Sequence, residues 1–315
     1  MAETTNTIFG PVPSRRLGFS LGIDLVPYKV CSLDCVYCQI DHTTNKTLER
    51  REYVCIDTIL NQLKTRLAEG VHADVISLTG SGEPTLNSGL GQLIDGIRML
   101  TSIPITIITN STLLNDPAVR AQCCKADIVL PSLDAVLPDP YTKVNRPHEK
   151  LEAEFLVEGL ANFRHEFSGE IWLEVFLIEG LNTDTNHLLA LKQAIDRITP
   201  DRVQLNTAVR PTADSGITRL SPERMLFIAG QLGPQCEIIA DFSKAPSTAE
   251  ETIGKEHILN LVNRHPCSMS DICACLGLSR CKAQSLVTAL TDLCQVVFTQ
   301  RDGTIYYSTP KSSPS

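Results

Sequence analysis

Three cysteines in one short loop are the residues of this chain best suited to chemistry. Cys31, Cys35 and Cys38 stand in CxxxCxxC spacing, directly after an apolar run at 21–26 that predicts a β-strand. A loop of this length can turn all three sulfurs toward one object. A structural zinc site takes four protein ligands, so it would require a fourth donor from elsewhere in the chain. A [4Fe-4S] cluster held by three cysteines instead leaves one iron open to an external chelating molecule.

The composition limits the class of protein that carries this loop. The chain has 315 residues, of which 43% are hydrophobic, enough for one large α/β domain and a small one. The N-terminus lacks an apolar targeting core and no apolar run is long enough to span a bilayer, so we expect a cytoplasmic protein without a membrane partner. Twelve cysteines in such a chain favour metal binding and buried thiols over disulfides. The net charge of −8 argues against nucleic-acid binding through the whole surface and leaves a local basic patch open.

The elements that must position the loop alternate between strands and helices. Strands are predicted at 21–26, 75–78, 105–108, 127–130, 171–178, 203–205 and 237–240. Helices, marked by apolar residues at helical spacing, are predicted at 54–67, 90–100, 118–124, 151–167, 186–198 and 222–232. The segment 9–18 is rich in turn residues and is expected to be an approach loop. Six strand–helix units in this order predict a parallel sheet with right-handed connections.

Polar residues follow the predicted strands. They are Ser81, Gly82 and Glu83 after the second strand, Asn110 after the third, Ser132 and Asp134 after the fourth, and Asn206 after the sixth. In parallel α/β architectures the working residues gather at the carboxyl ends of the strands. We therefore expect these residues and the cysteine loop to face one another across one mouth.

Two motifs in this order resemble the radical S-adenosylmethionine (SAM) superfamily. The first is the CxxxCxxC loop with an aromatic residue, Tyr37, before its last cysteine, and the second is Gly80-Ser81-Gly82-Glu83-Pro84 after the second strand. The resemblance covers residues 9 to about 241 and implies an α/β fold with a partial (β/α)6 TIM-like barrel, which agrees with the count of strand–helix units. Segments at 9–24, 144–148 and 204–211 further resemble iron–sulfur oxidoreductases related to wyosine-base enzymes.

The resemblance implies a radical SAM enzyme and a role for most of these residues. Cys31, Cys35 and Cys38 would each ligate one iron of a [4Fe-4S] cluster, while the amino and carboxylate groups of SAM chelate the fourth iron. Glu83, with the backbone of Ser81 and Gly82, would accept hydrogen bonds from the SAM amino group. The other cofactor-binding candidates are Tyr37, Asn110, Ser132 and Asn206, with Asp134 as a weaker one. Ser111 departs from the family pattern, which usually has glycine there, and puts the path of that loop in question.

The implied reaction begins at the cluster. With an electron from an external donor such as ferredoxin or flavodoxin, the cluster would cleave SAM to methionine and a 5′-deoxyadenosyl radical, which abstracts hydrogen from an unidentified substrate. A barrel interior suits this step because it excludes water and stray hydrogen donors. No catalytic side chain is assigned.

Several supporting residues have two interpretations. Asn206 either caps a turn or contacts the cofactor. The arginines that are either surface residues or contacts for an anion are Arg15, Arg16, Arg146 and Arg210. On the strand at 171–178, Trp172 and Phe176 are expected in the core and Glu174 on the opposite face or at the mouth.

The composition changes after residue 242. The segment 243–254, rich in Ser, Ala, Pro, Thr and Glu, predicts a linker between a barrel domain at 1–242 and a small domain at 255–315. Helices at 256–262, 269–276 and 280–293, then strands at 296–299 and 304–307 around an Asp-Gly turn, resemble a winged-helix domain. Its cysteines, which either hold an auxiliary cluster or redox sensor or fill a compact core, are Cys267, Cys273, Cys275, Cys281 and Cys294.

Two functions remain open at this point. In the first, the chain is a radical SAM enzyme whose winged-helix-like domain recognises RNA or a peptide. In the second, it is a redox-sensing iron–sulfur regulator whose winged helix binds DNA. The small domain has six basic and four acidic residues, a weakly basic balance that favours docking of protein, peptide or RNA over DNA. A sensor also has no need of Glu83 and the polar strand ends.

Overall fold

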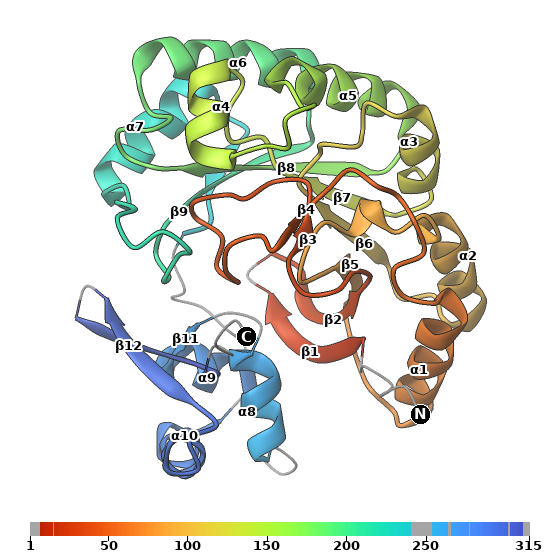
Figure 1. Ribbon diagram of the computed structural model, residues 1–315, viewed down its shortest axis with the longest axis vertical. Helices are drawn as coiled ribbons and strands as arrows, with labels where there is room; N and C mark the ends of the chain where they lie inside the picture. The colour runs from red at the N-terminus through yellow and green to blue at the C-terminus, as the bar shows by residue number, and fades with distance from the viewer. Residues whose placement is uncertain are drawn as a thin grey trace.

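The computed structural model describes residues 7–14, 16–240, 254–263, 266–276, 278–301 and 303–310 (Figure 1). Arg15 and the predicted linker, apart from Gly254, lie outside the described residues. Within the described ranges, none of the helices combines the length and apolarity needed to cross a bilayer.

A mostly parallel sheet of eight strands forms the centre of the molecule. Its order is β1-β2-β5-β6-β7-β8-β9-β10, and every neighbouring pair is parallel except β1 and β2. The strands are β1 (Ile8–Ser14), β2 (Gly18–Asp24), β5 (Val75–Thr79), β6 (Ile105–Thr109), β7 (Ile128–Pro131), β8 (Glu170–Leu177), β9 (Arg202–Thr207) and β10 (Cys236–Ile238). β1 and β10 end this order, so the sheet is open, which is consistent with the predicted partial barrel.

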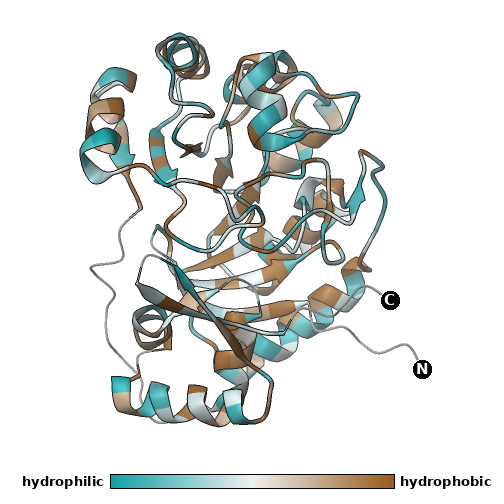
Figure 2. Cartoon of the chain, turned by 60° about the vertical axis from the view of Figure 1, so that its left-hand side comes forward, coloured by the Kyte–Doolittle hydropathy of each residue, from teal (hydrophilic) through white to brown (hydrophobic). Residues whose placement is uncertain are grey.

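Helices cover the outer side of the sheet (Figure 1). They are α1 (Ile56–Ala68), α2 (Leu90–Leu100), α3 (Pro117–Cys123), α4 (Pro138–Asn145), α5 (Ala153–Glu166), α6 (Thr185–Ile198) and α7 (Pro222–Leu232), with a short 3-10 helix, η1 (Pro84–Leu86), after β5. The helices carry alternating hydrophobic and hydrophilic bands (Figure 2). Their apolar stripes, with Ile59, Leu93 and Leu191 wholly buried, form one core with the strands.

The first strand corrects the prediction of an approach loop at 9–18. β1 runs antiparallel to β2, with Ile8 opposite Ile23 and Ser14 opposite Gly18. Pro11 and Pro13 lack an N–H group and would interrupt a central strand. An edge strand has one neighbour, and the register of β1 shifts between Phe9 and Val12, so the prolines are tolerated here.

A smaller C-terminal unit follows. Its helices α8 (Lys255–Val262), α9 (Met269–Leu276) and α10 (Arg280–Asp292) accompany an antiparallel sheet of β11 (Cys267–Ser268), β13 (Thr304–Ser308) and β12 (Val297–Arg301), in that order. It has a separate core that includes Ile258, Ile272 and Val287. The predicted hairpin is formed, and the Asp302 of its turn lies outside the described residues.

This unit holds the loop that follows β9. The Arg301 guanidinium donates to three acceptors, which are Arg210 O at 3.0 Å, Thr212 Oγ1 at 3.3 Å and Ile217 O at 2.5 Å. Tyr306 Oη donates to Val209 O at 2.7 Å. Val12 of β1 packs against the core of the unit. The C-terminal unit therefore contacts the edge strand β1 and the loop after β9.

Candidate active site

The cysteine loop follows β2 and is held against the loop after β5. Lys29 N donates to Ser81 O at 2.7 Å, and Glu83 N donates to Val30 O at 3.1 Å. A side chain at position 82 would place its Cβ 1.8 Å from Val30 O, so Gly82 is needed for this close approach. Two short strands within the loop, β3 (Val30–Cys31) and β4 (Asn45–Lys46), pair and close it.

Each sulfur of the triad contacts a side-chain nitrogen. The contacts are Lys29 Nζ to Cys38 Sγ at 3.1 Å, Asn145 Nδ2 to Cys35 Sγ at 3.4 Å and Asn110 Nδ2 to Cys31 Sγ at 3.5 Å. The three donors come from the start of the cysteine loop, the end of α4 and the end of β6, respectively. Segments far apart in the sequence therefore converge on one set of thiols.

The protein alone does not favour charged sulfurs at Cys31 and Cys35. Burial raises the pKa of the Cys31 thiol to about 12, and the Glu83 carboxylate adds to the rise. Burial also raises the pKa of Cys35 well above its ordinary value, with Asp134 contributing. Because the thiolate is the form that binds metal, a cationic group at the triad would supply the compensating charge.

Glu83 joins the loops after β5 and β6. Its Oε1 accepts hydrogen bonds from Thr85 N at 3.1 Å, Thr85 Oγ1 at 2.6 Å and Thr109 Oγ1 at 2.6 Å. Its Oε2 accepts one from Asn110 N at 2.7 Å. The side chain is 2% exposed, and burial raises its pKa while these donors act in the opposite direction. Glu83 thus has a structural task that the sequence did not predict.

Asp134 is the centre of a second buried network. Its Oδ2 accepts from Tyr37 Oη at 2.5 Å and from Asn145 Nδ2 at 2.7 Å, and its Oδ1 accepts from Phe176 N at 2.8 Å. The Tyr37 ring stacks on Phe176 with their centroids 3.9 Å apart. Burial raises the pKa of Asp134 to about 6, with the three donors opposing the rise. The network fixes Tyr37 and Asn145 beside the cysteines.

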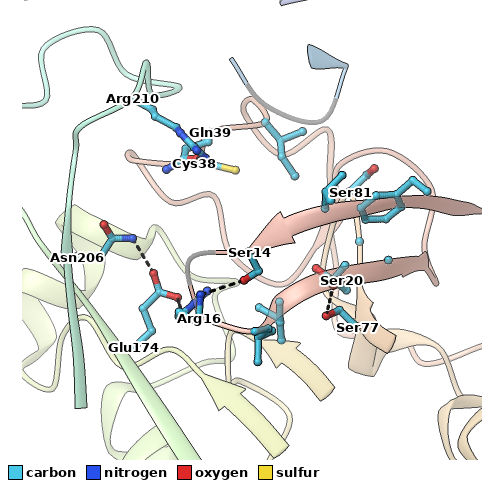
Figure 3. Close-up of a pocket in the computed structure, with 18 of the residues that line it drawn as sticks. Ser14, Arg16, Ser20, Cys38, Gln39, Ser77, Ser81, Glu174, Asn206 and Arg210 are labelled. Atoms are coloured by element: carbon cyan, nitrogen blue, oxygen red, sulfur yellow. Dashed lines mark hydrogen bonds and ion pairs between the residues drawn. The ribbon is translucent and has the colours of Figure 1, made fainter. Parts of the chain in front are cut away.

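A third network lies inside the barrel (Figure 3). Arg16 Nη1 contacts Glu174 Oε2 at 2.6 Å, and Asn206 Nδ2 donates to Glu174 Oε1 at 2.9 Å. Glu174, Trp172 and Phe176 all point into the barrel, so the expectation that Glu174 faces the opposite side is wrong. Residues two apart on a strand share a face. Arg16, proposed as an anion contact, is instead paired with a carboxylate.

The second and third networks border a cavity of about 420 Å³. Its wall includes Cys38 and Gln39 of the cysteine loop, Ser81 of the loop after β5, and the inward-facing Glu174 and Asn206 (Figure 3). The remaining polar wall is contributed by Arg16, Ser20, Ser77 and Arg210, and Leu261 of α8 closes one side. Tyr37, Ser81 and Asn206 are the predicted cofactor residues that line this cavity, whereas Gly82, Glu83, Asn110 and Ser132 are not part of its lining.

Comparisons with known proteins bear on this cavity and its cysteine loop. Residues 25–191 match the model of the family described as the radical SAM superfamily. A UPF0026 protein of Methanocaldococcus jannaschii is 30% identical over 95% of this chain and 94% of its own length. One from Synechocystis is 38% identical over 67% of this chain and 78% of its own length. The chain belongs to the radical SAM superfamily and, within it, to the UPF0026 family.

Two other similarities reach less far. A protein of Brachyspira hyodysenteriae named GTPase Obg is 38% identical over 83% of this chain, but the chain spans only 39% of that protein's length. Its name therefore carries no activity over to this chain. Solved structures of TYW1 with a lysine–pyruvate adduct bound (TM-score 0.50, 20% identity, 68% of this chain and 72% of that one) and of a radical SAM methyltransferase from Sphaerobacter thermophilus (0.50, 16%, 70% and 66%) share the fold.

Membership of the radical SAM superfamily makes this chain a radical SAM enzyme and implies a [4Fe-4S] cluster and SAM. The chemistry of the triad fits such a cluster, since thiolates are its usual ligands. Within the described residues, no group of three or more His, Cys, Asp or Glu is arranged around a single metal ion. A cluster makes no such demand, because each cysteine binds a different iron. A second observation fits a bound group at the triad. Asn145 Oδ1, buried beside Cys35, has no hydrogen-bond partner among the described residues.

The structure shows how Ser111, where the family pattern usually has glycine, shapes the loop after β6. Ser111 adopts the left-handed conformation (φ 71°) that glycine usually provides, and it is fully buried. Its Oγ donates to Ser132 O at 2.8 Å and connects the loop after β6 to the end of β7.

The Arg146 guanidinium donates two hydrogen bonds to the Asp214 carboxylate, at 3.1 and 2.5 Å. This pairing favours a structural role for Arg146 over an anion contact.

Proposed function

We propose that Cys31, Cys35 and Cys38 hold the [4Fe-4S] cluster of this radical SAM enzyme, and that SAM binds between this triad and the barrel cavity. The observation that carries the proposal is the position of Cys38, which belongs to the triad and to the cavity wall at once. A molecule attached to the cluster on that side would extend into the barrel.

When bound and reduced by a donor such as ferredoxin or flavodoxin, the cluster supplies the electron that breaks the S–C5′ bond of SAM, giving methionine and a 5′-deoxyadenosyl radical that takes hydrogen from the substrate. The protein groups bind and orient. Within the described residues Glu83 Oε2 accepts one hydrogen bond, against three on Oε1, so Oε2 is the oxygen able to accept from the SAM amino group. The backbone of Ser81 and Gly82 lies beside it.

Other residues would hold the nucleoside part of SAM. Tyr37, fixed by Asp134 and stacked on Phe176, offers an apolar surface in the cavity wall. Asn206 faces the same cavity, while Asn110 and Ser132 follow the neighbouring strands and support its rim. Val12 and Leu261 close the cavity toward the C-terminal unit, which keeps water from a reactive intermediate.

For the C-terminal unit we propose a winged-helix-like domain at 255–315, joined to a barrel domain at 1–242, that presents RNA or a peptide to the barrel. Its three helices and its antiparallel hairpin support this interpretation. The weak positive charge of this segment favours such docking over sequence-specific DNA binding.

The test is anaerobic reconstitution with iron and sulfide, followed by addition of dithionite and SAM. We expect 5′-deoxyadenosine, measured by liquid chromatography and mass spectrometry, from the wild type and from Cys55→Ser, which changes an exposed cysteine outside the loop. Cys38→Ser should form none. An iron-loaded wild type that yields no 5′-deoxyadenosine, together with a specific, salt-sensitive DNA complex, would favour the redox-sensing regulator instead.

A further inference from the structure

Lys29 is a buried lysine whose charge points at one sulfur of the triad. Lys29 is 3% exposed, and its Nζ lies 3.1 Å from Cys38 Sγ. We propose that Lys29 is a positioning residue that raises the reduction potential of the cluster by holding its ammonium against Cys38. This inference rests on the proposed placement of the cluster.

The backbone holds Lys29 in this position. Its N–H donates to Ser81 O at 2.7 Å, and its carbonyl accepts from Thr44 N and Asn45 N, both at 3.2 Å. Its φ of 56° is left-handed, a conformation that is unfavourable for a lysine and persists only where surrounding contacts fix it. The fixed backbone therefore aims the side chain inward, where most lysines extend into water.

No carboxylate accounts for the buried charge. In the part of the chain that the structure describes, Lys29 forms no ion pair with an Asp or Glu, and its side chain has Cys38 as its hydrogen-bond partner. A buried ammonium is costly unless a negative group compensates it. The group that its Nζ contacts is Cys38 Sγ, which becomes a negatively charged thiolate when it binds iron.

The other two side-chain donors to the triad differ from Lys29 because they are neutral and because each donates to a second acceptor. Asn110 Nδ2 also donates to Ser32 Oγ at 2.9 Å, and Asn145 Nδ2 also donates to Asp134 Oδ2 at 2.7 Å. Both amides are neutral and lie farther from their sulfurs, at 3.5 and 3.4 Å. Lys29 thus supplies the one charged donor to the three sulfurs among the described residues, at the sulfur that borders the cavity.

The electrostatic consequence has a definite sign. One-electron reduction adds a negative charge to an iron–sulfur cluster, and hydrogen bonds to its sulfurs and nearby net charge set its potential. A cation near a ligand sulfur stabilises the reduced form more than the oxidised form. Removing that cation should therefore make the cluster harder to reduce.

The test is an EPR-monitored redox titration of the reconstituted protein without SAM. Lys29→Met removes the charge and the donor, Lys29→Arg keeps both, and Lys46→Met is the matched control. Lys46 belongs to the same loop but donates to Arg146 O and Pro147 O, both at 3.2 Å, rather than to sulfur. We expect a more negative midpoint potential in Lys29→Met, and potentials near the wild-type value in the other two. An unchanged midpoint in iron-loaded Lys29→Met overturns the proposal.

A second comparison covers a variant that does not retain iron. If Lys29→Met fails to load, Lys29→Gln, which keeps a neutral N–H donor, is compared with Lys29→Arg. A more negative midpoint in Lys29→Gln supports the charge effect, and equal midpoints overturn it. Failure of the wild type to bind iron or form 5′-deoxyadenosine would instead reject the proposed function, so the two failures are distinguishable.

Discussion

The cysteines of the loop after β2 and those of the C-terminal unit have different surroundings. In the loop, three sulfurs within eight residues each contact a side-chain nitrogen from a different segment. In the C-terminal unit, the cysteines whose side chains are described are the buried Cys267 on β11, the half-buried Cys273 on α9, and the exposed Cys281 and Cys294 at opposite ends of α10. Cys281 lies in the first turn of α10 and Cys294 lies two residues past its end, so the eleven helical residues between them hold the two about 16 Å apart.

The contrast shows that the surroundings of a cysteine, rather than the number of cysteines nearby, distinguish a candidate ligand. Cys267 fits the expectation of a small apolar residue in a compact core, whereas Cys281 and Cys294 are exposed and fill no core. The spread of these positions weakens the hypothesis of an auxiliary cluster. It also supplies matched controls for the loop.

The largest expected difference between the two regions is in iron binding. Cys35→Ala should abolish cluster binding, because the two remaining cysteines and the amide of Asn145 cannot supply the missing thiolate. Cys273→Ala should bind as much iron and acid-labile sulfide as the wild type. Iron analysis of both reconstituted proteins checks this, and equal iron loss in the two variants would erase the distinction between the regions.

A smaller but still large effect, on stability, is expected at Glu83, which connects the loops after β5 and β6. Glu83→Ala leaves four buried donors without their acceptor, and we expect the free energy of unfolding to fall by about 3 kcal/mol or more. Urea unfolding of the iron-free protein measures this loss. Glu69→Ala, which breaks an exposed pair with Arg66, should change stability by less than about 1 kcal/mol. Similar losses in both would mean that the Glu83 network contributes little.

An intermediate effect is expected where the two regions are joined. Arg301→Ala removes three hydrogen bonds to the loop after β9, whose Ala213 N in turn donates to Cys38 O at 2.8 Å. We expect iron release to a chelator to become several-fold faster and amide exchange at 207–217 to increase. Arg280→Ala, on the exposed start of α10, is the control. Unchanged release rates in Arg301→Ala would show that the C-terminal unit does not support the cysteine loop.

The smallest effect is a pH dependence that belongs to the barrel alone. His187 is buried, with Nε2 3.2 Å from Val136 N and Nδ1 2.9 Å from Asn182 O, and burial lowers its pKa below the ordinary 6.5. The unfolded chain therefore takes up a proton that the native ring does not. This stability is present above about pH 6.5 and is lost as the pH falls below it.

Urea unfolding at pH values between 5.5 and 7.5, in steps of about 0.5, tests this contribution. It gives the free energy of unfolding as a function of pH. Because burial raises the pKa of Asp134 to about 6, its contribution runs in the opposite direction in this window, and the test is the difference between wild type and His187→Gln. The stability of the wild type relative to His187→Gln should fall toward low pH, and the exposed His257→Gln in the C-terminal unit should follow the wild type. A difference that instead grows toward low pH in favour of the wild type would contradict the sign.

The alternation of strands and helices was predictable because apolar spacing is a local signal. The sequence placed β5 through β9 and their helices to within a few residues, but it missed α4 (Pro138–Asn145) and β1. Both contain two prolines, which argue against regular structure unless they fall in a first helical turn or on a sheet edge. Whether a strand lies at an edge depends on the whole sheet, which no local pattern reveals.

The candidate site was predictable in outline and not in its contacts. Motif spacing and strand order brought the cysteine loop, Glu83 and Asn110 to one mouth. Nothing in the sequence indicated that Lys29 points inward, or that Arg16 and Glu174 pair across 158 residues. Such contacts depend on the three-dimensional positions of the side chains. Of the two positions expected for Glu174, the opposite face and the mouth, the structure excludes the first, because residues two apart on a strand share a face.

The prolines of β1 have a consequence for the behaviour of the protein at high concentration. An open sheet exposes strand edges, and an unpaired edge is a template on which a second chain can add a strand and aggregate. Within its seven residues, β1 lacks the amide hydrogens of Pro11 and Pro13 and is interrupted by a register shift. Val12 of the same strand also packs against the C-terminal unit, so the edge next to the cavity is a poor template for self-association, even though the barrel never closes.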